Sequence, residues 1–260
     1  MEILVYFFIF FLGLSVGSFL NCLIYRLEAR ESFLKGRSFC PHCRRVLSWW
    51  DLIPVFSFLI LKGKCRYCYQ KISWQYPLVE LTTGLLFLLI FNFQLSPALS
   101  QFITTLYLFI ISSFLIVIFV YDLKHSIIPD KVIYPAIATA LIFNFQLPIF
   151  NQFSIFKFSI LSALGAAAFF LTIVLISRGK WMGGGDVKLA FLMGLFLGWP
   201  NILVALFLAF LIGAIIGIGL IISGKKTLKS EVPFGPFLVT GTFIALFWAE
   251  KLINWYLNIL

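Results

Sequence analysis

Long apolar runs follow one another along almost the whole chain, and one polar stretch interrupts them early. A helix needs about 20 apolar residues to cross about 30 Å of hydrocarbon. Eight runs meet or approach this length, with ends defined to within about two to four residues: 3–25, 77–94, 99–121, 131–149, 154–177, 186–199, 201–222 and 234–256. The pattern predicts an all-α polytopic membrane protein with about eight transmembrane helices.

Two of these runs need comment. The run 3–25 lacks the basic start and small-residue cleavage site of a secretory signal peptide, so we expect it to be retained as the first span. The weakest division is the one between 186–199 and 201–222, because only Trp199-Pro200-Asn201 separates them.

Composition and charge agree with a membrane protein and give it an orientation. Of 260 residues, 62% are hydrophobic and only 12% are charged, against about 25% charged in soluble domains. Short cytoplasmic loops are enriched in Lys and Arg. Eighteen of the 20 Lys and Arg residues lie on one face, in or beside 26–76, 122–131, 178–188 and 223–231. We therefore expect these loops in the cytoplasm and both termini outside.

The net charge of +10 does not by itself indicate nucleic acid. The cations lie beside membrane spans and form no recognisable module for binding RNA or DNA. Basic residues in this position favour the anionic headgroups of the inner leaflet. The expected partner of these charges is membrane lipid, with no nucleic acid bound.

The polar stretch 26–76 carries two C-x2-C pairs, Cys40 with Cys43 and Cys65 with Cys68, separated by 21 residues. Four thiolates satisfy zinc in a tetrahedron without an open position, so this spacing predicts a structural Zn²⁺ site. A domain of about 50 residues has a small core, and the metal would supply much of its stability.

Two disulfides are the alternative, although a cytoplasmic loop would keep its thiols reduced. His42 lies inside the first pair and is expected to be a bystander. Cys22, the fifth cysteine, lies in the first span and is expected to be a small packing residue.

Acidic residues inside spans are functional candidates, since each costs about 2.5–3.5 kcal/mol at a helix centre. Glu80, Asp122, Asp130 and Asp186 remain once loop and terminal acids are set aside. Asp122 ends the apolar run 114–121, and Asp186 opens another span from the same face. The topology therefore brings the carboxylates of Asp122 and Asp186 to a similar depth near the cytoplasm.

Two carboxylates that share a site hold one proton near neutral pH, which is the chemistry of an aspartyl protease. The charged group activates water, and the protonated group hydrogen-bonds the peptide carbonyl. Gly183, Gly184 and Gly185 have no side chains to block a substrate backbone. The alternative is that both aspartates are interfacial helix-end residues, with Asp186 as an N-terminal cap.

Several segments stand out from the apolar background, in a fixed order along the chain. They are 17–27 (GSFLNCLIYRL), the two cysteine pairs, 76–84 (YPLVELTTG), 122–130 (DLKHSIIPD), 183–189 (GGGDVKL) and 232–237 (VPFGPF). This ordered set resembles the type IV prepilin peptidase family, the bifunctional leader peptidases and N-methyltransferases of pilus, type II secretion and competence systems. The GxGD part is shared with presenilin-type proteases and is weak alone, whereas the ordered set is specific.

The resemblance implies catalytic roles for Asp122 and Asp186, while Asp130 shapes the helix start after Pro129. Lys188 is expected to extend toward lipid headgroups, with a role in the local field of the site as the alternative.

The resemblance also implies S-adenosyl-L-methionine as methyl donor, but no Gly-rich nucleotide loop on a βαβ unit is present to locate its site. Glu80 and Gly84, beside the first loop, are the methyl-transfer candidates. Glu80 would hold the amine near the donor methyl. A helix cap or a structural ion pair at Glu80 fits the sequence equally well.

The expected organisation is a first span (1–25), a cytoplasmic zinc-binding loop domain associated with methyl transfer (26–76) and a membrane peptidase domain (77–260). In the bacterial inner membrane, such a protein would cut the short cytoplasmic leader of a prepilin or pseudopilin and methylate the new amino terminus. The alternatives are a peptidase without methylation and a noncatalytic zinc-binding scaffold for pilus assembly.

The oligomeric state is open at this stage. Gly13 and Gly17 lie four residues apart in the first span, a spacing that lets two helices approach closely. The partner helix would belong either to the same chain, which is the commoner outcome, or to another copy.

Overall fold

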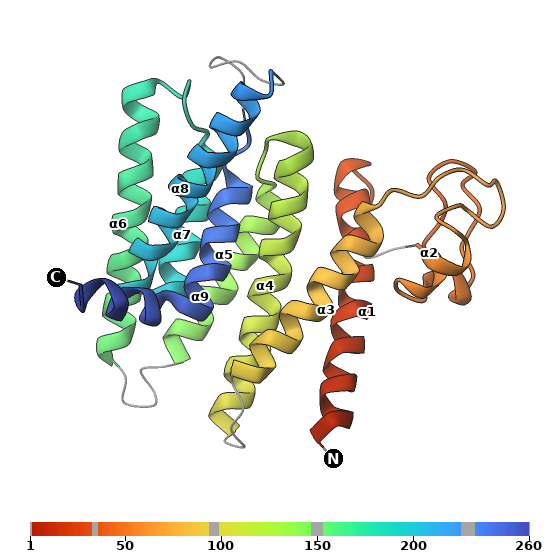
Figure 1. The fold of residues 1–260 in the computed structure, drawn as a ribbon, viewed down its shortest axis with the longest axis horizontal. Helices are drawn as coiled ribbons and strands as arrows, with labels where there is room; N and C mark the ends of the chain where they lie inside the picture. Colours follow the sequence, from red (N-terminus) through yellow and green to blue (C-terminus); the bar gives the residue numbers. More distant parts are fainter. Residues whose placement is uncertain (1, 33–35, 94–98, 147–152, 225–231, 260) are drawn as a thin grey trace. The chain divides into compact units, whose positions relative to one another are not determined.

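The structure is a computed structural model that describes residues 2–32, 36–93, 99–146, 153–224 and 232–259 (Figure 1). Within these residues it is helical, and β-structure is limited to two isolated bridges in the polar stretch. Its longer helices are α1 (Glu2–Glu28), α3 (Gln75–Phe93), α4 (Leu99–His125), α5 (Asp130–Gln146), α6 (Phe153–Ser177), α7 (Gly184–Leu197), α8 (Asn201–Ile222) and α9 (Gly235–Leu257). The predicted all-α architecture is confirmed.

Six of these helices are long and apolar enough to cross a membrane: α1, α3, α4, α6, α8 and α9. Helices α5 and α7 have only 17 and 14 described residues, which at 1.5 Å per residue makes them about 25 and 21 Å long. The predicted count of eight spans is therefore not confirmed by the described residues. The weakest predicted division is confirmed, since α7 ends at Leu197 and α8 begins at Asn201.

The chain forms two compact units, residues 1–117 and 118–260, and the boundary falls within α4. In the first unit, α1 packs along α3. Gly13 and Gly17 face this crossing, where an added Cβ would lie 2.7 Å from the Cα atoms of Gly84 and Glu80, respectively. The glycine spacing of the first span thus serves packing within the chain.

In the second unit, α7 is the central helix and contacts α5, α6, α8 and α9. Its side chains Leu189, Leu192 and Met193 have no exposed surface. Gly194 lets α6 approach so closely that an added Cβ would meet the Cα of Ala163 at 2.4 Å. A helix that is covered by its neighbours need not match the bilayer thickness, which explains why a short apolar run can occupy this place.

The polar stretch between α1 and α3 folds around two short helices, the 3-10 helix η1 (Trp49–Leu52) and α2 (Phe56–Ile60). Phe58 packs against Trp74, with ring centroids 5.0 Å apart. Apart from two cysteines, Phe58 is the one buried hydrophobic side chain between residues 36 and 74, all of which are described. This domain therefore has very little apolar core of its own.

Candidate active site and cysteine cluster

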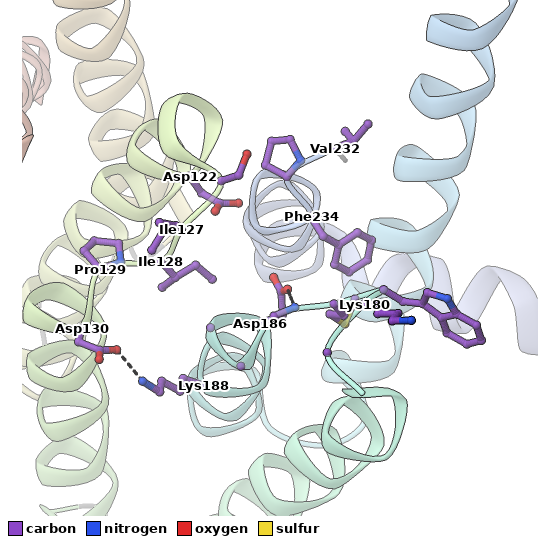
Figure 2. Close-up of a pocket in the computed structure, with 18 residues that line it drawn as sticks. Asp122, Ile127, Ile128, Pro129, Asp130, Lys180, Asp186, Lys188, Val232 and Phe234 are labelled. Atoms are coloured by element: carbon purple, nitrogen blue, oxygen red, sulfur yellow. Dashed lines mark hydrogen bonds and ion pairs between the residues drawn. The ribbon is translucent and has the colours of Figure 1, made fainter. Parts of the chain in front are cut away.

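Asp122 and Asp186 line one cavity of about 570 Å³ in the second unit. Asp122 comes from the last turn but one of α4, and Asp186 from the first turn of α7. Figure 2 shows both carboxyl groups turned toward the same space, with Phe234 beside it. The structure thus brings together the two acids that the sequence placed at similar depth.

The carboxylate of Asp122 is held by the start of α9. The backbone N–H of Gly235 donates a hydrogen bond to Asp122 Oδ2 at 3.0 Å, and Asp122 is only 4% exposed. A Cβ at residue 235 would lie 2.6 Å from that same oxygen. A helix N-terminus carries unpaired N–H groups and partial positive charge. Gly235 therefore permits an approach that no side-chain-bearing residue would allow.

Gly235 and Phe234 are site residues that sequence reasoning did not single out. The segment 232–237 was noted only as part of the family resemblance. Val232, Pro233 and Phe234 line the cavity, and the next residue supplies the donor to Asp122. A proline-flanked glycine at the start of an apolar run was the available signal, because Pro favours the first helical turn.

The glycine run before α7 has three different environments. The N–H of Gly183 donates to Asp186 Oδ2 at 3.3 Å. Gly183 is the N-cap of α7 and Asp186 is the third helical residue, so Asp186 supports the helix start but is not the N-cap of the helix-end alternative. An added Cβ at Gly185 would lie 3.1 Å from Ile128, whereas one at Gly184 would meet nothing within 4 Å. Only Gly184 thus leaves open space at the cavity wall.

Lys188 forms an ion pair with Asp130 at the edge of the same cavity, with Nζ and Oδ1 2.6 Å apart (Figure 2). Its Nζ also lies 4.8 Å above the ring of Tyr134. The favoured prediction that Lys188 extends toward lipid headgroups is wrong in this structure. The ion pair instead ties the start of α7 to the start of α5.

The four cysteines of the two C-x2-C pairs meet in the first unit, with their Sγ atoms all within 4.8 Å of one another. The Sγ atoms of Cys40 and Cys68 are 3.9 Å apart. A tetrahedral site with metal–sulfur bonds of about 2.3 Å has sulfurs about 3.8 Å apart, whereas a disulfide needs about 2.05 Å. The cluster therefore fits one metal ion.

The two knuckles share one backbone design. The N–H of Arg44 donates to the Cys40 carbonyl at 2.9 Å, and the N–H of Tyr69 donates to the Cys65 carbonyl at 3.0 Å. Arg44 and Tyr69 both have positive φ, 56° and 58°. In each knuckle the backbone thus turns back on itself immediately after the second cysteine, which points both thiols of the pair in one direction.

Asp51 braces the cluster from η1. Its carboxylate accepts hydrogen bonds from Ser48, from Arg66 at 2.7 Å and from Tyr67 at 3.3 Å. Burial alone would raise the pKa of Asp51, but the bonds from Ser48 and Arg66 hold it below its ordinary value. Arg66 and Tyr67 lie within the second knuckle. The Asp51 carboxylate therefore holds the second knuckle against η1, the helix that follows the first knuckle.

Glu80 and Gly84 lie on the face of α3 that packs on α1. Glu80 is 7% exposed and accepts a 2.7 Å hydrogen bond from the backbone N–H of Val55, as well as a bond from the Ser18 side chain. A Cβ at Gly84 would lie 2.9 Å from the ring of Phe10. Glu80 therefore joins the polar loop to both helices, and Gly84 is covered by α1.

The fold and the site together define a class of protein, the multi-pass membrane proteins that hold two aspartates from different helices in one cavity. Residues 11–93 match the bacterial peptidase A24 N-terminal domain. Residues 109–218 match the type IV leader peptidase family, and the chain belongs to this family.

Relatives of known name resemble the chain over nearly its full length. The prepilin leader peptidase/N-methyltransferase of Legionella pneumophila is 33% identical, covering 95% of this chain and 92% of its own. The protein of the same name from Bacillus subtilis (strain 168) is 33% identical, with 96% and 97% covered. That of Aeromonas salmonicida is 31% identical, with 96% and 93% covered. No solved structure matches the chain significantly.

Proposed function

We propose that this protein cleaves the leader peptide of prepilin-like proteins at the cytoplasmic face of the membrane and then N-methylates the new amino terminus. The observation that carries the first half is the pair Asp122 and Asp186 in one cavity. The second half rests on the relatives, whose shared name includes N-methyltransferase.

The cleavage chemistry follows from the pair. One carboxylate removes a proton from water, the resulting hydroxide adds to the scissile carbonyl carbon, and the other carboxylic acid gives its proton to the carbonyl oxygen. Collapse of this tetrahedral species breaks the C–N bond, and the leaving amine takes up a proton. The Gly235 N–H occupies one acceptor site of Asp122 Oδ2, which leaves Oδ1 and the second lone pair of Oδ2 for water or substrate.

The orientation supports a substrate whose leader lies in the cytoplasm. The cavity is formed by chain segments 122–130, 179–188 and 232–234, and these segments include Lys124, Lys180 and Lys188, three of the cations from which the cytoplasmic face is inferred. A prepilin would bring its scissile bond to this end of the bundle while its apolar helix stays in the membrane. Residues 77–260 would form this peptidase domain.

Methyl transfer needs a donor, which we propose to be S-adenosyl-L-methionine, the activated methyl that such an N-methylation requires. The packing around Gly84 leaves that residue no room to touch a donor, since Phe10 and the backbone of Gly13 cover it. Gly84 thus contributes by letting α1 and α3 approach. Glu80 keeps the role of candidate for holding the amine, and its bond to Val55 also makes it a structural anchor.

The cysteine cluster would hold a structural Zn²⁺ within the loop domain 26–76. Binding of zinc to four thiolates contributes on the order of 10 kcal/mol, whereas burial of one large apolar side chain such as Phe58 contributes about 1.5–3 kcal/mol. Metal binding is thus the larger stabilising contribution in this part of the chain. The four ligands would be Cys40, Cys43, Cys65 and Cys68.

Replacement of Cys65 with Ser should therefore unfold the loop domain. We expect purified Cys65→Ser protein to lose its zinc and to become sensitive to trypsin between residues 26 and 76, while the rest of the chain stays protected in the membrane. Cys22→Ser is the matched control, because Cys22 lies in α1 outside the cluster. Retention of about one zinc per chain in Cys65→Ser would contradict the assignment.

A reconstituted reaction tests the function as a whole. Purified protein in lipid nanodiscs is given a prepilin and isotopically labelled S-adenosyl-L-methionine, and the mass and amino-terminal methylation of the product are measured. We expect a leaderless, monomethylated product. Cleavage without methyl incorporation would show a peptidase that lacks methyltransferase activity. Absence of cleavage, under conditions where a known family member cuts, would overturn the proposal.

The same reaction separates the two roles of Glu80. A Gln at this position keeps an oxygen that accepts the Val55 N–H but removes the charge. If Glu80 holds the amine, Glu80→Gln lowers methylation by about 10²-fold or more and leaves cleavage within about twofold of the parent. Unchanged methylation would restrict Glu80 to its structural bond.

A further inference from the structure

The short helix α2 lies at membrane depth, although it belongs to the polar loop. The N–H of Val55, at its N-terminus, donates to Glu80, which in turn is bonded by Ser18. Ser18 lies ten residues before the end of α1 at Glu28, about 15 Å along the helix axis. Glu80 lies five residues into α3, about 7 Å along its axis.

These positions lie within the hydrocarbon layer. The candidate span in α1 has 26 residues, or about 39 Å, which exceeds a hydrocarbon core of about 30 Å by about six residues. Even if all six extra residues protrude on the loop side, the edge of the hydrocarbon core lies near Cys22. Cys22 is about 6 Å along α1 from Ser18, in the direction of the loop. Figure 1 likewise shows α2 level with α1 and not beyond its end.

The cysteine cluster lies farther out. Phe39, next to the first cysteine, packs on Tyr25, with ring centroids 5.8 Å apart. Tyr25 is seven residues beyond Ser18, or about 10 Å closer to the water. The first knuckle therefore lies farther out than α2, which faces the bilayer. Helix η1 contacts α2 and, through Asp51, also the second knuckle.

The side chains that η1 and α2 expose are large and apolar. Trp49, Trp50, Phe56, Leu59 and Ile60, hereafter the apolar ridge, are between 50% and 74% exposed. The two indoles stack on each other with centroids 3.5 Å apart. Such a surface is rare on a water-exposed loop, while paired Trp rings are typical of the membrane interface.

Cations follow the apolar ridge directly. Lys62 and Lys64 come two and four residues after Ile60, and Arg44 and Arg45 precede Trp49. The stretch 26–76 has ten Lys and Arg against Glu28, Glu31 and Asp51. Apolar side chains bordered by positive charge match an anionic leaflet, in which rings enter the acyl boundary and cations meet phosphates.

We propose that the apolar ridge is inserted in the lipid leaflet beside α1 and α3, which makes the metal-binding loop a monotopic element of the membrane as well as a loop between spans. The minimum depth of about 6 Å for Ser18, which is bonded to the same carboxylate as Val55, falls within the 5–10 Å at which interfacial helices lie. The occupant of this surface is lipid of the protein's own bilayer.

The backbone supports a fixed position for α2. Val55 has φ = 61°, a conformation that is strained for a β-branched residue. In this conformation the backbone N–H of Val55 donates a 2.7 Å hydrogen bond to Glu80. A turn held against its local preference by a buried carboxylate of a span places α2 beside the span and keeps it there.

Photo-crosslinking in native membranes tests the insertion on the full-length, metal-loaded protein. A benzophenone-bearing phenylalanine replaces Ile60, and in the control it replaces His42, which is exposed on the outward knuckle. After irradiation, mass spectrometry identifies what is attached to each position. We expect phospholipid adducts at position 60 at least about tenfold more often than at position 42. Membrane insertion and thermal stability are measured on both proteins to show that they are folded.

The other occupants give different products. Attachment of a prepilin at position 60 would assign the apolar ridge to the substrate, and a crosslinked dimer would assign it to a second copy. Lipid adducts at equal frequency at both positions, or at neither, would also overturn the proposal. These outcomes do not depend on whether the protein methylates or cleaves, so failure here is distinct from failure of the proposed function.

Discussion

Asp186→Asn protein should insert into the membrane normally and fail to cleave a prepilin. Asn neither accepts a proton from water at neutral pH nor donates one as an acid, so the pair loses its shared proton. General acid–base groups contribute about 10²–10⁴-fold each, and both roles fail together here. We expect the cleavage rate to fall by roughly 10³-fold or more, measured as leader release from purified prepilin in detergent or nanodiscs.

Asp122→Asn should have the same effect, because the two carboxylates act as one unit and their losses do not add. Glu250→Gln is the control, since Glu250 is an exposed acid near the far end of α9. It should cleave at the parental rate. An Asp186→Asn protein that still releases leader at a tenth of the parental rate would remove Asp186 from the catalytic pair and return it to a helix-capping role.

The second large effect is expected at Gly235. In Gly235→Ala, the new methyl group would lie 2.6 Å from Asp122 Oδ2, well inside van der Waals contact, so the carboxylate must move. A displacement of about 1 Å at a reacting group can cost about 10²-fold in rate. We therefore expect the rate of leader cleavage to fall by about 10²-fold. The pH-independent plateau of the pH–rate profile should be lowered, and substrate binding should change little.

A matched glycine separates this effect from general damage to a membrane helix. Gly217 lies within α8, and an added Cβ there meets nothing within 4 Å. Gly217→Ala should keep parental cleavage and thermal stability, and Gly235→Ala should keep stability near that of the parent. Equal cleavage by the two variants would show that Asp122 does not need the close approach that a glycine at residue 235 allows.

The parts of this fold that follow from local pattern were predictable, and contacts between distant segments were not. Apolar length predicted the helices, and cysteine spacing predicted a cluster that could hold metal. The bond from Gly235 to Asp122 joins residues 113 apart, and no periodicity in either segment indicates which helix start meets which carboxylate. That contact depends on how α9 packs in the second unit.

The errors of prediction have the same origin. Lys188 was expected to extend to lipid, but the structure pairs it with Asp130, 58 residues away. The run 186–199 was read as a full span because composition measures hydrophobicity and not coverage by neighbours. Its helix proves to be the central, enclosed one of its unit.

The brevity of α7 has a consequence for how water reaches the scissile bond. A helix of 14 residues covers about 21 Å, so it leaves a hydrophobic mismatch of about 9 Å against an average bilayer. Because α5, α6, α8 and α9 enclose α7, its Asp186 end does not border lipid and opens instead into the cavity that Asp122 also lines. Water that enters this cavity at the end of the short helix would supply the nucleophile.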